Sequence, residues 1–315
     1  MTKNTTKFLF SLLAGILLLT NVYSQRGDMF ISQHMLHTPF TNSAAMGMKP
    51  HFNGAIFYKS QILGIEGAPS IQALNVNAPI MDGRSHVGFS LNNDMIGPNM
   101  YSKILGSYAY TIEAFNNNYL SFGISAGVDL LQNKRAGIPV NDELDPIFAN
   151  NSKMFVLPNF NLGIFYFTRK YFVGIGVNEI LSTDIVTTDG FKSELDFDLA
   201  EIPFNMQAGY TFELNENFDL KTYLFAKKIE PGFYQADLTV ITEFNKMVGV
   251  GFSYRTPGAL NIISTLNISD IFKLGYAFDY NFSDIRSVTA GSHELMLIFN
   301  LKKEKQNAII DSPRY

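Results

Sequence analysis

The sequence predicts an all-β fold: an antiparallel transmembrane β-barrel of about 14 strands, of the outer-membrane type. Three observations support this prediction. Apolar and polar residues alternate over stretches of roughly ten residues, as in a strand with one face in lipid. No stretch after the N-terminus reaches the roughly eighteen apolar residues of a membrane helix, and mean hydropathy is only +0.05. Connections between the alternating stretches form a short set and a long set.

The clearest alternation lies between residues 202 and 228. Phe204, Met206 and Tyr210 share one face of the first run, and polar residues such as Gln207 share the other. An Asn-Glu-Asn turn at 215–217 leads into a second alternating run, which predicts a β-hairpin. Each run has about the length that a tilted strand needs to cross a bilayer, whereas strands of soluble proteins most often have about five or six residues.

The same pattern predicts the other strands in order, about fourteen in all, an even number as in single-chain bacterial barrels. The expected strands are 50–61, 70–79, 85–94, 100–113, 118–131, 155–167, 171–180, 203–214, 217–228, 233–243, 246–255, 259–268, 271–280 and 291–301.

The connections alternate in length along the chain. Short turns follow every second strand, for example at 81–83, 168–170 and 215–217, whereas the other set includes the long loops 132–154 and 181–202. Outer-membrane barrels have short periplasmic turns and longer extracellular loops. We therefore expect the short turns and both chain termini to face the periplasm.

The two ends of the chain fall outside the expected barrel. Lys3 and Lys7 precede an apolar run at 8–19, which predicts a secretory signal peptide over 1–24 with cleavage after Ser24. The run is short for the alternative, a membrane-spanning helix. Residues 25–49 have no clear period, and we expect them in the lumen as a plug or against the periplasmic rim. Residues 302–315 form a charged tail, expected in the periplasm.

Composition excludes several classes of function. A net charge of -4 without a basic stripe argues against nucleic-acid binding. The absence of Cys excludes disulfides and thiolate metal sites, and the five His residues show no zinc-site spacing. We therefore expect no enzyme activity, no cofactor and no metal. Acidic clusters at 142–145 and 194–198 leave open a calcium site or ordinary solvated loop carboxylates.

A series of motifs spans nearly the whole mature chain in a fixed order. The series opens with Phe-Ile-Ser-Gln-His-Met-Leu-His-Thr-Pro at 30–39, and its later members lie at 58–61, 67–72, 93–98, 157–159, 171–174, 253–255, 274–276, 279–280 and 291–294. In order and spacing these motifs resemble the PorP/SprF family of type IX secretion outer-membrane proteins of Bacteroidota. Ile62 departs from the family's usual Trp, and Ser43 and Ala45 interrupt its Asn-Pro-Ala-Tyr-like segment near Asn42.

The resemblance implies a non-enzymatic outer-membrane component of the type IX secretion system. Some family members assist export or surface attachment of large adhesins, including those used in gliding, and others associate with the periplasmic ring of the motor. The expected partners are a secreted adhesin or its C-terminal domain, other ring or translocon components, and outer-membrane lipid. Two alternatives remain open: a transporter of small hydrophobic molecules, since such barrels can also have fourteen strands, and an outer-membrane enzyme.

The alternation of connections also suggests a binding site. The expected first and last hairpins become neighbours when the barrel closes, and their extracellular ends would form one shared rim. We hypothesise that this rim docks an exported protein. The alternative is that its residues only form turns and close the barrel. The candidate partner-binding residues are Gly67, Ala68, Pro69, Asp94, Gly97, Pro98, Arg255, Asp279, Tyr280, Ser292, His293 and Glu294.

Overall fold

The computed structural model describes residues 31–61, 67–81, 83–115, 118–134, 136, 151–180, 182–183, 195–196, 202–230, 233–256, 258–282 and 291–301. The expected signal peptide, the C-terminal tail and the side chains of both acidic clusters lie outside these residues. Within the described residues, no helix is long and apolar enough to cross a membrane.

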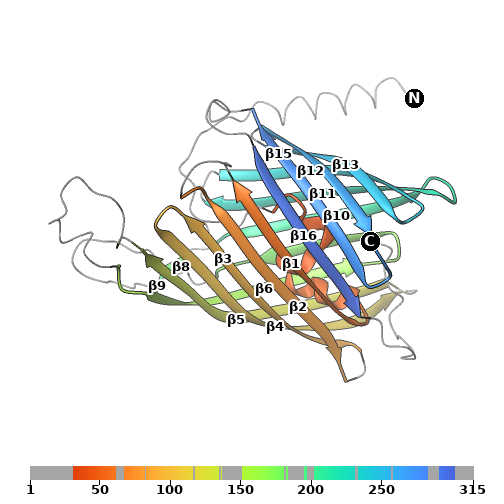
Figure 1. Cartoon of the computed structure of the whole chain (residues 1–315). Coiled ribbons are helices and arrows are strands. Elements are labelled where there is room, and N and C mark those ends of the chain that lie inside the picture. Colours follow the sequence, from red (N-terminus) through yellow and green to blue (C-terminus); the bar gives the residue numbers. More distant parts are fainter. Residues whose placement is uncertain are drawn as a thin grey trace, which may run out of the picture.

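Fourteen antiparallel strands close into one barrel, in which β1 pairs with β16 (Figure 1). The predicted fold class is therefore confirmed. The barrel strands are β1 (Phe52–Gln61), β2 (Ser70–Ile80), β3 (Ser85–Ile96), β4 (Asn99–Phe115), β5 (Asn118–Asn133), β6 (Phe155–Phe167), β7 (Tyr171–Val177), β10 (Phe204–Glu213), β11 (Phe218–Glu230), β12 (Phe233–Phe244), β13 (Val248–Arg255), β14 (Ala259–Asn267), β15 (Phe272–Asn281) and β16 (Ser292–Leu301).

The strands match the sequence expectations to within a few residues at each end. The expected strand 171–180 is shortened most and ends at Val177, because Glu179 adopts a positive φ of 51°, which interrupts the regular ladder. A two-stranded sheet of β8 (Ser182–Thr183) and β9 (Leu195–Asp196) was not anticipated.

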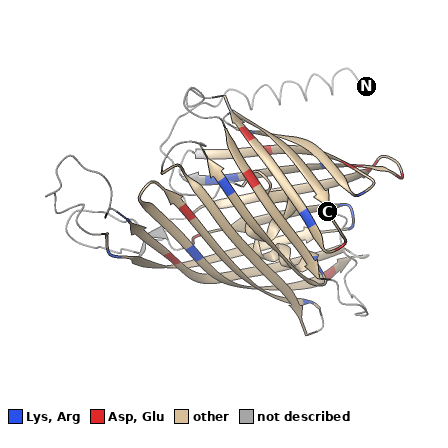
Figure 2. Ribbon diagram, viewed as in Figure 1, with Lys and Arg blue, Asp and Glu red and all other residues tan. Residues whose placement is uncertain are grey.

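The strands turn their apolar side chains outward. On β6, Leu162 and Ile164 are 52% and 50% exposed, whereas the inward Phe165 is fully buried. Lys, Arg, Asp and Glu occupy few positions along the strands (Figure 2). An outer wall of exposed Leu, Ile, Val and Phe is stable in lipid, where no water contacts it.

The two ends of the barrel differ. One end holds the turns β2–β3, β4–β5, β6–β7, β10–β11, β12–β13 and β14–β15, and is called here the short-turn end. At the β12–β13 turn, Asn245 and Lys246 adopt φ values of 49° and 55°, which make the tight reversal. The opposite, long-loop end holds the connections β5–β6, β7–β10 and β15–β16.

The segment of residues 31–50, called here the lumen segment, lies inside the barrel. It contains three 3₁₀ helices: η1 (His34–Leu36), η2 (Thr38–Phe40) and η3 (Ser43–Met48). Figure 1 shows them enclosed by the strands, and every residue of η3 is buried. The segment begins beside β16 near the long-loop end and leads into β1 at the short-turn end. It therefore crosses the lumen.

Glycines in the wall make room for the lumen segment. A Cβ added to Gly123 would lie 2.3 Å from the backbone nitrogen of Ala44, and one added to Gly163 would lie 2.0 Å from Asn42 Oδ1. Asn42 in turn donates from Nδ2 to the backbone oxygens of Ile164 and Ile175, at 3.3 and 3.0 Å. The absence of side chains at these wall positions lets the two backbones approach closely.

Candidate functional site

Five charged residues gather inside the barrel towards the long-loop end. Lys59, Asp237, Arg255, Asp279 and Glu294, called here the lumen ion cluster, come from five different strands and are all buried. Strand alternation points each side chain inward. The register then pairs them, because Lys59 lies opposite Glu294 between β1 and β16, and Asp237 lies opposite Arg255 between β12 and β13.

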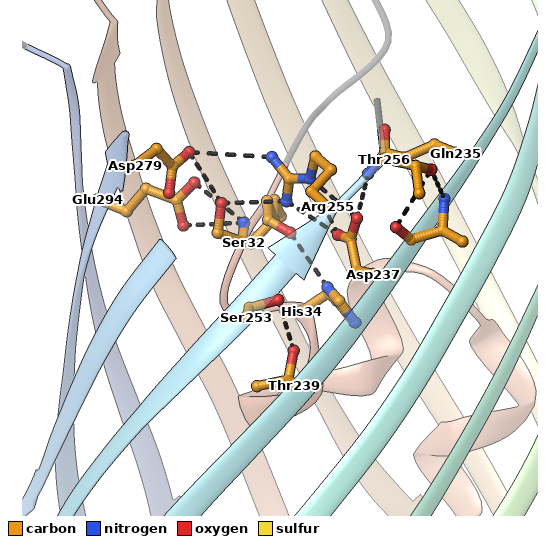
Figure 3. Close-up of polar contacts among 12 residues, drawn as sticks. Ser32, His34, Gln235, Asp237, Thr239, Ser253, Arg255, Thr256, Asp279 and Glu294 are labelled. Atoms are coloured by element: carbon orange, nitrogen blue, oxygen red, sulfur yellow. Dashed lines mark hydrogen bonds and ion pairs between the residues drawn. The ribbon is translucent and has the colours of Figure 1, made fainter. Parts of the chain in front are cut away.

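The cluster has two centres of positive charge. Lys59 Nζ lies 2.8 Å from both Asp279 Oδ2 and Glu294 Oε1. Arg255 binds Asp237 with Nε at 3.0 Å from each carboxylate oxygen and with Nη2 at 3.0 Å from Oδ2 (Figure 3). Paired, hydrogen-bonded geometry of this kind is what allows charges to remain buried.

Ser32 of the lumen segment joins the two centres. Its backbone N–H donates to both oxygens of Glu294, at 3.0 and 2.9 Å. Its hydroxyl donates to Asp279 Oδ2 at 2.9 Å and accepts from Arg255 Nη2 at 3.0 Å (Figure 3). The lumen segment is thereby attached to β13, β15 and β16 by charge-assisted hydrogen bonds, which are stronger than neutral ones.

Two histidines of the lumen segment contact opposite walls. The His34 ring packs on Phe225 of β11 at 4.4 Å, and His37 Nε2 lies 2.7 Å from Asn75 Oδ1 of β2. These two contacts fix η1 and the residue after it between β11 and β2.

The structure separates the twelve candidate partner-binding residues into groups. Arg255, Asp279 and Glu294 belong to the lumen ion cluster, and Ser292 and Asp94 are also buried. Asp94 lies on β3, two strands from Lys59, since both pair with Ile71 of β2. The structure thus brings three of the candidates together below the rim.

Five other candidates form turns at the long-loop end, namely Gly67, Ala68, Pro69, Gly97 and Pro98. The N–H of Gly97 donates to the oxygen of Gly67 at 3.0 Å, which links the β1–β2 and β3–β4 connections. The φ values of 74° at Gly67 and 56° at Gly97 explain why glycine is needed at both positions. Gly67 and Gly97 are exposed, and Ala68 and Pro69 are half-buried.

The remaining two candidates, Tyr280 and His293, lie on the outer wall near the same end. His293 Nδ1 lies 2.7 Å from the hydroxyl of Tyr276, and its ring packs on Phe278 at 5.1 Å. Tyr280 contacts Phe282 edge-on at 5.5 Å. These aromatic contacts belong to the surface that faces the bilayer interface.

Comparison with known protein families shows to which family this barrel belongs. A family model described as type IX secretion system membrane protein PorP/SprF matches residues 24–299. The chain belongs to the PorP/SprF family. The match runs from before the lumen segment to within β16, so it includes the whole lumen ion cluster. The family indicated by the sequence motifs is confirmed.

Solved structures similar to this PorP/SprF chain are also barrels. The monoaromatic hydrocarbon channel CymD gives a TM-score of 0.55 at 10% identity, covering 88% of this chain and 94% of that chain. Acinetobacter baumannii Omp33 gives 0.47 at 9% identity, covering 81% and 100% of the two chains. At such identities the likeness to CymD shows the fold alone. No curated protein matches the chain significantly.

Family and fold together assign the protein to the outer membrane. As a PorP/SprF protein it is an outer-membrane component of the type IX secretion system, and its partners belong to that system.

Sequence reasoning missed three members of the site, Ser32, Lys59 and Asp237. Asp237 carried a signal, because the inward-facing positions beside it on β12, Gln235 and Thr239, are also polar. Lys59 carried a weaker one, because it shares the inward face of β1 with Ala55 and Phe57. No turn joins β1 to β16, so the sequence did not set the register that places Lys59 opposite Glu294. Ser32 carried no such signal, because the lumen segment has no period from which its depth could be derived.

Proposed function

We propose that this PorP/SprF protein is a non-enzymatic partner for the export or surface attachment of a secreted adhesin of the gliding type. The carrying observation is the lumen segment, which fills the barrel and is held by the Ser32 contacts. A filled lumen favours a protein that works through its surface over one that conducts small molecules, so the segment is proposed to act as a plug.

The proposed docking surface is the rim at the long-loop end, which we take to be extracellular. Pairing of β1 with β16 brings the connection at 67–69 beside the start of β16. The Gly97 to Gly67 hydrogen bond adds the β3–β4 turn to the same surface. Below it, the lumen ion cluster joins β1, β12, β13, β15 and β16. The rim would thus present an adhesin or its C-terminal domain with a pre-formed surface.

The alternative is an outer-membrane anchor for the periplasmic motor ring. Exposed charged side chains at the short-turn end favour it, among them Arg84, Arg169, Glu216 and Lys246. Under this alternative the working face would be the short-turn end. A transporter of small hydrophobic molecules is less well supported, since the lumen segment crosses the path such a molecule would take.

A pull-down from native outer membranes, followed by mass spectrometry, distinguishes these functions. Ala68→Arg places a large cation on the proposed rim, and Glu216→Arg makes a matched change on an exposed short turn. We expect Ala68→Arg to lose a co-purifying adhesin and Glu216→Arg to retain it. Loss of periplasmic ring proteins by Glu216→Arg alone would favour the anchor. Retention of the adhesin by both variants would rule out the rim at 67–69.

A further inference from the structure

A row of neutral polar side chains crosses the outer wall on β1 to β4, which are neighbours in the barrel (Figure 1). Tyr58, Gln72, Asn93 and Ser102 follow one another in the register, each directly opposite the next on the neighbouring strand. All of them lie on the outward face: Tyr58 is 46% exposed, Gln72 is exposed, and Asn93 and Ser102 are half-buried. These residues are called here the outer polar row.

The outer polar row lies within the apolar wall and not at its edge. On the side of the long-loop end, Met95 of β3 lies opposite Met100 of β4. On the side of the short-turn end, the next outward row is apolar throughout and consists of Ile56, Leu74, Leu91 and Ile104. Barrel strands alternate apolar side chains towards lipid with polar ones towards the lumen, so a polar row on the lipid face departs from the rule.

The row has hydrogen-bonding groups that the chain itself does not use. Ser102 Oγ donates to Asn93 Oδ1 at 2.8 Å, but within the described residues no acceptor meets the side-chain N–H groups of Asn93. Nor does any described residue form a hydrogen bond with the Gln72 amide or the Tyr58 hydroxyl. Lipid tails cannot satisfy such groups, whereas polar side chains of a second protein in the membrane can.

The absence of charge on this face argues against a lipid phosphate as the partner. Within the described strands β1 to β4, the Lys and Arg residues are Lys59 and Lys103, and both form ion pairs on the lumen side, with Glu294 and Glu179. The outer polar row therefore has no cation beside it to bind a phosphate.

A second copy of the chain fits the row better. Amide and hydroxyl groups both donate and accept hydrogen bonds, so two identical rows can pair without repulsion. A copy inserted in the same direction carries its row at the same depth in the membrane, so the two rows meet. Ser60 and Ser70, which lie opposite each other beside the row, are small and allow the two walls to approach closely.

We propose that β1 to β4 form the contact surface of a homodimer within the membrane, with the outer polar row of one copy against that of the other. The contact is isologous, because the same surface of both copies takes part. The connections β1–β2 and β3–β4 lie above these strands, so the dimer places the two rims side by side. The proposal does not depend on the adhesin role.

Cysteine cross-linking in native outer membranes tests the proposal, because the chain has no cysteine of its own. Gln72→Cys places a thiol in the row, and Val156→Cys places one on β6, where the same register continues through Leu130 with apolar residues. We expect a short bis-maleimide to join two copies of Gln72→Cys and to leave Val156→Cys monomeric. Cross-linking of both variants, or of neither, would overturn the proposal. Cross-linking of Gln72→Cys to a chain of another mass would also overturn it and would assign the row to a different membrane protein.

Leucine substitutions test whether the polar groups hold the two copies together. Gln72→Leu combined with Asn93→Leu removes both amides and suits a lipid-facing wall, so the barrel should fold, which heat-modifiable mobility on SDS gels checks. We expect this double variant to raise the dissociation constant of the dimer in detergent at least about tenfold, as measured by light scattering over a range of concentrations. Thr242→Val removes an exposed, outward hydroxyl of β12, outside the proposed contact, and should leave the constant unchanged. Equal constants for the double variant and Thr242→Val would refute the role of the row.

Discussion

Arg255 connects the two parts of the lumen ion cluster. It binds Asp237 through two nitrogens, donates to Ser32, and lies 3.9 Å from Asp279. Replacing it with Met would leave Asp237 buried without its cation. We expect Arg255→Met to destabilise the barrel by about 3–5 kcal/mol, as found when one partner of a buried ion pair is removed. Urea unfolding from liposomes, followed by gel mobility, measures this.

A second substitution distinguishes two causes of the lost stability, the unpaired charge of Asp237 and the lost packing of the Arg255 side chain. Adding Asp237→Asn to Arg255→Met removes the unpaired charge, so the double variant should regain much of the lost stability. Lys246→Gln should change stability by less than about 0.5 kcal/mol. A double variant no more stable than Arg255→Met would show that the ion pair is not the cause.

The sequence predicted the position of these residues along the chain better than their depth. Arg255 follows Gly249, Gly251 and Ser253 on the small and polar face of its strand, which is the face that points inward. Counting connections located it at the end with the long loops, where the structure has it, but an end contains both a rim and the lumen below it. The period of two shows which side chains point inward. It does not show how deep they lie, unless an inward partner such as Ser32 is already known.

Among the elements, the strands were predictable and the 3₁₀ helices were not. A period of two imposed by lipid on one face is visible in sequence, and the fourteen expected strands all correspond to observed ones. The lumen segment is surrounded by the inner faces of the strands, so no face of it is consistently apolar and it shows no period in the sequence. Its small residues Ser43 and Ala44 fit against Gly123 of the wall, and this complementarity exists only in three dimensions.

The glycine contacts predict how the lumen segment can be displaced. Leucine at Gly163 would occupy the site of Asn42, whose Oδ1 lies 2.0 Å from the added Cβ. We expect Gly163→Leu to fold as a barrel but to show ion conductance in planar bilayers that the parent protein lacks, because the segment no longer fills the lumen. Gly106→Leu is the control, since Gly106 is exposed and a Cβ added to it would lie 3.9 Å from the nearest atom, the backbone oxygen of Ala126. Equal conductance of both variants would contradict this role of the segment.

At the scale of the whole molecule, the outer wall determines where the protein is stable. Leu162 is 52% exposed near the middle of β6, directly opposite Ile124 of β5, which is 54% exposed. In lipid, an arginine at a mid-strand outward position costs about 2–4 kcal/mol, whereas on a wet surface it costs less than about 0.5 kcal/mol. The same substitution therefore reports whether this wall contacts lipid or water.

We expect Leu162→Arg to lower the free energy of unfolding from liposomes by about 2–4 kcal/mol, and Glu216→Arg on a short turn to leave it nearly unchanged. Refolding of urea-unfolded chains into liposomes, followed by heat-modifiable mobility, measures both. The two variants have the same introduced side chain, so a difference between them arises from its surroundings. If Leu162→Arg were as stable as Glu216→Arg, the exposed apolar wall would face a partner or water at that point, and β6 would lie outside the lipid-contacting surface.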